Sequence, residues 1–397
     1  MSKLYNTNSD IVNSLFDFLQ NINYKMSRPL LNNISSILPA IINAENITSL
    51  DLSKNLFSLN DSINLESSEK KVWRLLNNKH FDGYSLYNAF ISKIISKLPT
   101  LKHNKLIVIF DHMYVRNNFV ILMFTLRVGT QGIPIYFRCD KTKSNRHREI
   151  DELNKKCLFS EKVIFNAIDD VIELLKPINS KIIFLADRWF CNLKLMKHIN
   201  DKGHHFCIRA KVNSSIKFLI YDNKEGHNIY KHFSDLTCQK HHSKYYYDIP
   251  FGSFKFKCNL AISRSIVSDD PWFILTNIEP NIAIREYSKR FGGIETTFKN
   301  QKSNGFNLEK THTRNINAFE NLYTLVCIAQ TWMVILGADY SKNYHHVKKK
   351  VNIRFVKTVN GKKVRILSLF NLGLTLFKTV FNSTINYKIK CNMILFM

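Results

Sequence analysis

The stretch YSKRFGGIETTFKNQK, residues 287–302, places one carboxylate among basic side chains. Glu295 and Lys302 are seven residues apart, close to two helical turns, so a helix would project both from one face. Tyr287 and Arg290 are three apart and are also neighbours on a helix. Such a face suits a site that grips phosphate, because Arg supplies a bidentate fork, Lys a point charge and Tyr a hydroxyl or a stacking ring. An exposed amphipathic helix with ordinary salt bridges is the alternative interpretation.

Two aspartates stand in a similar context earlier in the chain. Asp111 follows LIVIF and Asp187 follows IIFLA, so each is predicted at or near the end of a buried strand, where ligands bind in open α/β sheets. Either one alone could simply mark the end of a strand. Together with Glu295, they could hold two divalent cations. Two such metals about 4 Å apart can activate a nucleophile and stabilise the leaving oxygen of a phosphodiester.

The elements that must position these residues change along the chain. Residues 1–100 have the apolar periodicity of helices, and residues 101–211 turn to strands. There a predicted hairpin precedes strands that alternate with helices, which indicates an α/β or α+β sheet. Residues 212–278 alternate with period two, typical of an antiparallel β insertion. Residues 279–340 are helical again, and residues 341–397 form a basic C-terminal region.

The charge of the chain points to a polyanionic partner. It carries 57 Lys and Arg against 31 Asp and Glu, a formal net charge of +26, and a polyanion would relieve the self-repulsion. Nucleic acid is the leading candidate, because neutralised phosphates release counterions. A predicted helix with Lys70, Lys71 and Arg74 suits DNA binding by the N-terminal region, although a dimerisation bundle has the same pattern. A coding bias toward Lys, Asn and Ile is the other explanation of the charge.

Other classes of site find less support. The eight cysteines include no CxxC pair, which favours a reducing compartment over a disulfide framework. The histidine doublets lack partners at zinc-finger spacing, and residues 1–20 do not have the pattern of a signal peptide. The uncharged run 322–338 is shorter than the about 20 residues of a membrane span. We interpret it as a buried core helix and expect no membrane partner.

The block YSKRFGGIETTFKNQKSNGFNLEKTHTRN resembles the Tyr-x2-Arg-x3-Glu-x6-Lys signature of DDE transposases from bacterial insertion sequences. The matching positions are Tyr287, Arg290, Glu295 and Lys302. IIFLADRWF resembles the family's strand with the second catalytic aspartate, here Asp187, and IVIFDHMYV is similar to the block with the first, here Asp111. PWFILTNIE resembles the strand that closes the family's β insertion. The resemblance extends over roughly residues 45–375.

The resemblance implies a ribonuclease H-like mixed sheet, flanked by helices and interrupted by the β insertion. Asp111, Asp187 and Glu295 would hold two Mg²⁺ ions, with Mn²⁺ able to replace them. The enzyme would cut the transposon end to leave a 3′-OH, which attacks the opposite strand or target DNA. Its partners would be double-stranded DNA, at the terminal inverted repeats and the target, and a second copy in a homodimeric synaptic complex. A bacterial, cytoplasmic and nucleoid-associated protein is expected.

Several residues are candidates for DNA contact. Trp272, at the end of the insertion, could stack on a base flipped out during hairpin formation, with ordinary core packing as the alternative. The basic candidates for backbone contact are Arg188, Lys289, Lys299, Lys348, Lys349 and Lys350. The basic runs at 348–350 and 361–365 are interpreted either as a DNA-contacting tail or as solvated loops.

One departure from the signature concerns the spacing of Arg290 and Glu295. The family places three residues between them, whereas residues 291–294 make four here. On a regular helix the added residue changes their angular separation from about 40° to about 140°, which would turn Arg290 away from the site. A π-bulge at Gly292-Gly293 could absorb it. Alternatively, the helix starts at Gly293 and Arg290 lies in the preceding turn.

Two other functions remain open at this stage. One is a ribonuclease H-like nuclease that only hydrolyses DNA, against which the β insertion and the signature argue. The other is a decayed or domesticated transposase that binds DNA without catalysis, since the Gly292-Gly293 insertion could be a lesion. The three carboxylates and Lys302 are all present, which favours an intact enzyme.

Overall fold

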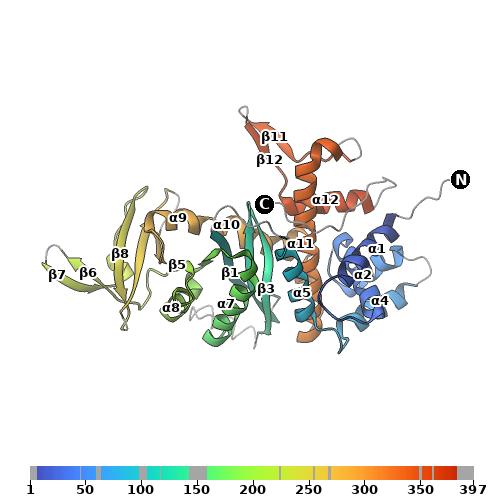
Figure 1. Ribbon diagram of the computed structural model, residues 1–397, viewed down its shortest axis with the longest axis horizontal. Coiled ribbons are helices and arrows are strands. Elements are labelled where there is room, and N and C mark those ends of the chain that lie inside the picture. The colour runs from blue at the N-terminus through green and yellow to red at the C-terminus, as the bar shows by residue number, and fades with distance from the viewer. Residues whose placement is uncertain are drawn as a thin grey trace.

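The computed structural model describes residues 7–44, 46–59, 64–97, 105–116, 118–142, 159–222, 225–253, 255–266, 270–347, 351–359 and 362–381. Within these residues, a mixed sheet of ten strands has the order β3-β2-β1-β4-β5-β10-β9-β8-β6-β7. Its strands are β1 (Lys105–Val115), β2 (Phe119–Val128), β3 (Gln131–Lys141), β4 (Lys181–Ala186), β5 (His205–Ala210), β6 (Phe218–Asp222), β7 (His227–Lys231), β8 (Ser243–Phe251), β9 (Phe256–Ser263) and β10 (Trp272–Thr276). Figure 1 shows the sheet continuing outward to the β6–β7 hairpin.

Two kinds of strand pairing meet at β1. It pairs antiparallel with β2, which pairs antiparallel with β3, and it pairs parallel with β4, which pairs parallel with β5. All residues of β4 after Lys181 are buried, as expected of a parallel strand covered on both faces. The ribonuclease H-like α/β fold expected from the sequence is confirmed by this mixed sheet and its flanking helices.

The strands of the predicted insertion extend the same sheet. β10 pairs antiparallel with β5, with Phe273 opposite Ala210, and β9 pairs with the other edge of β10. Backbone hydrogen bonds therefore run without interruption from β1 to the insertion. Trp272, the first residue of β10, has a fixed position relative to β5 and β4 as a result.

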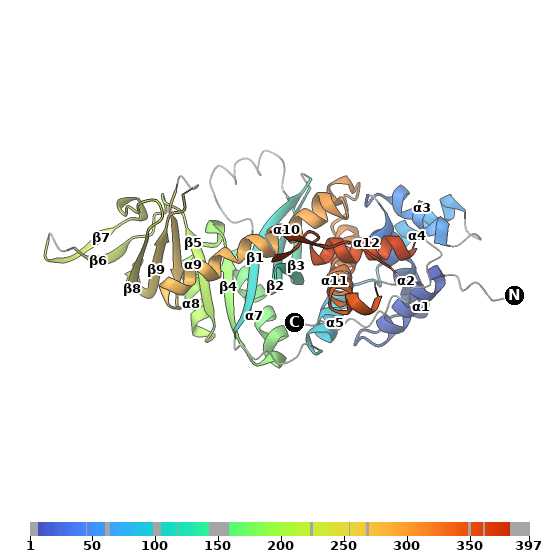
Figure 2. The same cartoon turned by 90° about the horizontal axis from the view of Figure 1, so that it is seen from above.

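Helices cover the two faces of the sheet (Figure 2). α7 (Glu161–Leu175) lies on one face with α8 (Leu193–Asp201), and the Tyr136 hydroxyl of β3 donates to Asp170 of α7 at 2.8 Å. α9 (Pro280–Ser288) and α10 (Arg290–Lys299) cross the other face. There the Thr297 hydroxyl of α10 donates to the carbonyl oxygen of Gly132 at 3.1 Å. Ile109 and Asp111 are two residues apart on β1, so both side chains point to this second face.

A long helix joins the sheet to the N-terminal helices. α11 (Ile316–Val347) packs against β3 on one side and against the N-terminal helices on another (Figure 1). The N-terminal helices are α1 (Thr7–Gln20), α2 (Arg28–Asn43), α3 (Ser49–Leu59), α4 (Leu65–Leu76) and α5 (Gly83–Ile95). Among the described residues, the segment Ile316–Tyr344 is long and apolar enough to cross a membrane, but 94% of its most apolar window is buried inside the protein. This agrees with the predicted core helix.

The C-terminal part packs on α11 through a hairpin and one helix. The hairpin consists of β11 (Val356–Val359) and β12 (Lys362–Arg365), and the helix is α12 (Leu369–Phe381). α11 and α12 cross at two glycines: a Cβ on Gly337 would overlap the carbonyl oxygen of Leu369, and one on Gly373 would overlap that of Met333. Both obstacles are backbone atoms, so no side-chain rotation can make room.

We expect Gly337→Ala to force α11 and α12 apart and to lower the free energy of unfolding by about 1–3 kcal/mol, the usual cost of overpacking. Urea denaturation followed by circular dichroism measures the change. Ala338→Ser, at the next, half-buried position of α11, is the control and should have a much smaller effect. Equal denaturation midpoints for Gly337→Ala and the wild type would contradict the close crossing.

Candidate active site

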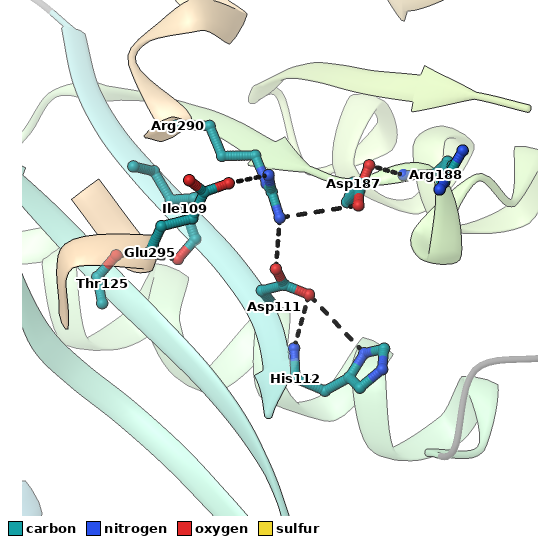
Figure 3. A network of polar contacts seen from close by, with 8 residues as sticks. All are labelled: Ile109, Asp111, His112, Thr125, Asp187, Arg188, Arg290 and Glu295. Atoms are coloured by element: carbon teal, nitrogen blue, oxygen red, sulfur yellow. Dashed lines mark hydrogen bonds and ion pairs between the residues drawn. The ribbon is translucent and has the colours of Figure 1, made fainter. Parts of the chain in front are cut away.

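Three carboxylates from separate elements converge on the face of the sheet that α10 covers (Figure 3). Asp111 projects from β1, Asp187 follows β4 directly, and Glu295 belongs to α10. Phe110 is the parallel partner of Ala186, so Asp111 and Asp187 occupy corresponding positions on adjacent strands. Both aspartates were predicted at or near the end of a buried strand; Asp187 directly follows β4, whereas β1 continues beyond Asp111 to Val115.

One guanidinium binds all three carboxylates. Arg290 Nη2 forms an ion pair with Asp111 Oδ2 and lies 3.8 Å from Asp187 Oδ2. Its Nη1 donates to Glu295 Oε1 at 3.0 Å. The Arg290 side chain is only 6% exposed, and its Nε has no hydrogen-bond partner within the described part of the chain. Arg290 is therefore the internal counter-ion of the cluster and lies between its members.

The backbone brings Arg290 into the site without either of the two arrangements expected from the sequence. α9 ends at Ser288 and α10 begins at Arg290, so the α-helix does not start at Gly293. Residues 290–299 are regular α-helix, and the π-helical turn comes afterwards, at Asn300–Asn304. Both expectations were wrong. Arg290 and Glu295 are separated by about 140° around a regular helix. The Arg290 side chain is long enough to reach Glu295 from the first position of α10 despite this angle.

The glycine pair has a packing role instead. A Cβ on Gly293 would overlap Cδ1 of Ile109 on β1, and one on Gly292 would lie 3.3 Å from the carbonyl oxygen of Thr130. Arg127 of β2 also donates to the carbonyl oxygen of Lys289. The first turn of α10 thus rests directly on the sheet. This close approach places Arg290 and Glu295 over Asp111.

Burial and charge act in opposite directions on the ionisation of the cluster. Burial raises the pKa of Asp111, while Arg290 and His112 pull it down and Asp187 pushes it up. The backbone N–H of His112 also donates to Asp111 Oδ1 at 2.8 Å. Burial likewise raises the pKa of Glu295, against the pull of Arg290. For Arg290, burial lowers the pKa, but Asp111 and the other acidic neighbours raise it above its ordinary value.

An aromatic cluster packs beside the guanidinium. Tyr287 is 1% exposed, and burial raises its pKa. Its ring packs edge-on against Trp272, with centroids 5.4 Å apart, and Trp272 stacks on Phe291 at the same distance. The sequence placed Tyr287 in the site as a hydroxyl or stacking ring. The structure places it under Trp272, where both rings support the first turn of α10.

Lys302 lies outside the carboxylate cluster. It belongs to the π-helical turn, and its Nζ is 3.1 Å from Glu309 Oε1. The second oxygen of Glu309 accepts the backbone N–H of Arg116 at 2.7 Å, and Arg116 directly follows β1. Glu309 thus ties Lys302 to the end of β1, and the lysine remains one-third exposed.

The candidate DNA contacts are distributed around the site. Arg188 and Lys299 are exposed, and the Arg188 backbone N–H donates to Asp187 Oδ1 at 2.7 Å. Lys289 Nζ is paired with Glu286 Oε2 at 2.6 Å. Lys348, Lys349 and Lys350 lie outside the described residues.

Arg209 is a site residue that the sequence analysis missed. Ile208 is the parallel partner of Ala186, so Arg209 stands beside Asp187 at the end of β5. Its Nε is buried and has no hydrogen-bond partner among the described residues, and its charge lowers the pKa of Tyr287 against the effect of burial. The signal was a lone arginine near the end of the apolar run HFCIRA, next to a strand that ends in a candidate ligand.

Residues 165–332 match the family model described as Transposase DDE domain. This region contains Asp187, Arg209, Arg290, Glu295 and Lys302, and it begins after Asp111. No curated protein matches the sequence.

We expect Arg290→Gln to lower the free energy of unfolding by about 3–5 kcal/mol, because it leaves Asp111, which is only 14% exposed, and its two acidic neighbours without their counter-ion. The loss should be larger at about pH 8 than at about pH 5. Without the guanidinium, the pKa of Asp111 and of Glu295 rises further, so the folded state binds protons that the unfolded chain releases, and stability falls as the pH rises. Thermal unfolding at both pH values measures this.

Lys197→Gln, which breaks the exposed pair with Asp201 on α8, is the matched control for Arg290→Gln and should leave the unfolding temperature almost unchanged. Equal losses in the two variants would mean that Arg290 does not neutralise the cluster.

Proposed function

We propose that this protein is a DDE transposase, which cuts transposon ends and joins their 3′-OH groups to target DNA. The observation that carries the proposal is the convergence of Asp111, Asp187 and Glu295 on one cationic group. These are the residues that the transposase signature predicts as metal ligands, and two of them lie in the region that matches the Transposase DDE domain.

The donor set of the site fits Mg²⁺, with Mn²⁺ as its substitute, because three carboxylates supply the hard oxygen ligands that such ions prefer. Their spacing is set by Arg290. In the described part of the chain, no three His, Cys, Asp or Glu side chains are grouped closely enough to hold one metal ion. Asp111, Asp187 and Glu295 would become such a group when Arg290 withdraws from between them.

When bound, two Mg²⁺ ions would activate the attacking water and stabilise the leaving oxygen of the phosphodiester. The protein side chains would grip the DNA around the scissile bond. Once released from the carboxylates, Arg290 offers a bidentate fork to a phosphate. Arg209, already without a partner at Nε, offers a second guanidinium beside Asp187. Lys302 would contribute a point charge after it leaves Glu309.

The partners and surroundings of the protein are part of the same proposal. The net charge of +26 suits binding to terminal inverted repeats and target DNA, and two ends would be held by a homodimer. α4 presents Lys70, Arg74 and the 63% exposed Trp73 for DNA binding by the N-terminal helices. Trp272 would leave Phe291 to stack on a flipped base. A cytoplasmic, nucleoid-associated location fits this role.

Glu295→Gln should abolish Mg²⁺-dependent cleavage of end DNA while leaving its affinity for that DNA within about twofold, since the change removes a metal ligand and preserves the side-chain shape. Cleavage is measured on gels and affinity by fluorescence anisotropy. The control, Glu173→Gln on α7, removes an exposed carboxylate from the opposite face and should cut normally. Residual cutting at the wild-type rate by Glu295→Gln would reject the metal assignment.

A strand-transfer assay with pre-cleaved ends separates a transposase from a nuclease. The transposase joins the 3′-OH to a target plasmid, whereas a ribonuclease H-like hydrolase gives no joined product.

A DNA-binding protein that has lost catalysis is the second candidate. The observation that favours it is Arg290 itself, which fills the space between the carboxylates and is one residue farther from Glu295 than in the signature. If Arg290 never withdraws, the protein binds end DNA and cuts none of it in any divalent metal.

Metal binding tests whether Arg290 is a barrier between the carboxylates. We expect the wild type to bind Mn²⁺ weakly without DNA, and Arg290→Gln to bind it severalfold more tightly, because no guanidinium then competes for Asp111, Asp187 and Glu295. Calorimetry or electron paramagnetic resonance of free Mn²⁺ measures this without any reaction. Arg188→Gln, beside Asp187 but exposed, is the control. Equal affinities in wild type and Arg290→Gln would show that Arg290 is not a barrier to the metal.

A further inference from the structure

A second cationic feature lies between the sheet and the C-terminal hairpin. A cleft of about 740 Å³ opens between the β2–β3 turn, the C-terminal part of α11 and the β11–β12 hairpin. Its lining residues are Thr130, Ser341, Tyr344, Arg354, Phe355, Val356, Thr358 and Arg365. This set contains two guanidinium groups and four hydroxyl groups and no carboxylate. Its chemistry is that of an anion-binding surface.

Neither arginine of the cleft is neutralised by an acid in the described part of the chain. Arg365 Nη2 donates to the Ser341 hydroxyl at 3.2 Å, an uncharged acceptor that leaves the positive charge available. Arg354 is exposed and forms no ion pair with any described residue. Two guanidinium groups that have no acidic partner among the described residues face one cleft and repel each other, so a bound polyanion would stabilise the arrangement.

The segment that carries Arg354, residues 351–355, is anchored to α11. Phe355 is 7% exposed, and its ring packs edge-on against Tyr344 and Tyr340, with centroids 5.1 and 6.0 Å away. The Tyr340 hydroxyl donates to the carbonyl oxygen of Val351 and accepts the backbone N–H of Ile353. The position of Arg354 relative to α11 is thus set before any ligand binds, which lowers the entropic cost of binding.

The β2–β3 turn lies between the cleft and the first turn of α10. Thr130 lines the cleft, and its carbonyl oxygen lies against Gly292 in the first turn of α10. Arg127, on the strand that enters this turn, donates to the carbonyl oxygen of Lys289, next to Arg290. A nucleic-acid strand with one phosphate at the carboxylates could therefore continue over this turn into the cleft.

We propose that this cleft binds the phosphate backbone of duplex DNA next to the bond that is cut, with Arg354 and Arg365 as its phosphate ligands. The inference rests on the proposed function for the identity of the polyanion. It gives the C-terminal hairpin a role in holding DNA, and it assigns that role to Arg365, the last residue of the basic run 361–365, together with Arg354, which lies outside both basic runs.

The test compares the salt dependence of DNA binding in two double variants of the full-length chain. The probe is a duplex of arbitrary sequence, and the affinity is measured by fluorescence anisotropy over a series of KCl concentrations. Arg354→Ser/Arg365→Ser should make the negative slope of log K against log [KCl] shallower by about 2, since each phosphate contact contributes about −0.9 to it. At a fixed salt concentration of about 0.1 M the same loss weakens binding by roughly tenfold or more.

The control removes the same charge from the other face of the sheet. Lys162→Ser/Lys197→Ser takes two exposed lysines from α7 and α8 and should leave the slope close to that of the wild type. Arg354→Lys/Arg365→Lys keeps the charge and should retain most of the slope while losing the bidentate contacts. Unfolding temperatures equal to that of the wild type show that the variants are folded.

Each other outcome has a distinct meaning. An unchanged slope in Arg354→Ser/Arg365→Ser overturns the cleft as a DNA site. If that variant instead changes the oligomeric state measured by light scattering without DNA, and its slope is unchanged, the cleft is an interface between copies and the proposal is wrong. Absence of DNA binding by the wild type would reject the proposed function itself.

Discussion

Three carboxylates held close together repel one another, and the arrangement around α10 depends on a single guanidinium that binds all of them. Arg290 reaches Asp111, Asp187 and Glu295 from the first position of α10. Burial raises the pKa of Asp111 and of Glu295, so without a cation the folded state would favour their protonated forms. The guanidinium neutralises the three carboxylates, and the proposed chemistry requires it to withdraw from between them.

That interaction requires a close approach of α10 to the sheet. Gly293 permits the contact with Ile109, and Gly132 of β3 has no side chain that would meet Thr297 Oγ1 or the carbonyl oxygen of Gly293. The same first turn touches Thr130, and so links the carboxylates to the arginine-lined cleft under the C-terminal hairpin. Glycine positions on both α10 and the sheet therefore determine how closely the charged residues of α10 approach those of the sheet.

Much of the fold could be predicted from the sequence, because its signals are local. Apolar runs that end near aspartates predicted β1 and β4, and period-two alternation predicted the strands of the insertion. The uncharged run at 322–338, predicted as a core helix, lies in the buried helix α11. The predictions about the backbone around Gly292-Gly293, a π-bulge or a helix that starts at Gly293, were wrong, since both considered only the local course of the helix. Their packing role depends on Ile109 and Thr130, which lie far away in the sequence. Arg209 was missed for the same reason: its place beside Asp187 follows from strand pairing.

The sequence by itself determined the order of the elements, the three carboxylates and the excess of positive charge, because strand and helix periodicity and residue chemistry are encoded within short segments. Only the tertiary structure decided which cation neutralises the carboxylates, that Lys302 pairs with Glu309 instead of joining them, and that two C-terminal arginines share a cleft with the β2–β3 turn. The contact between Arg290 and Asp111 spans 179 residues. Its existence depends on how closely a helix packs on a strand, and local periodicity contains no information about that distance.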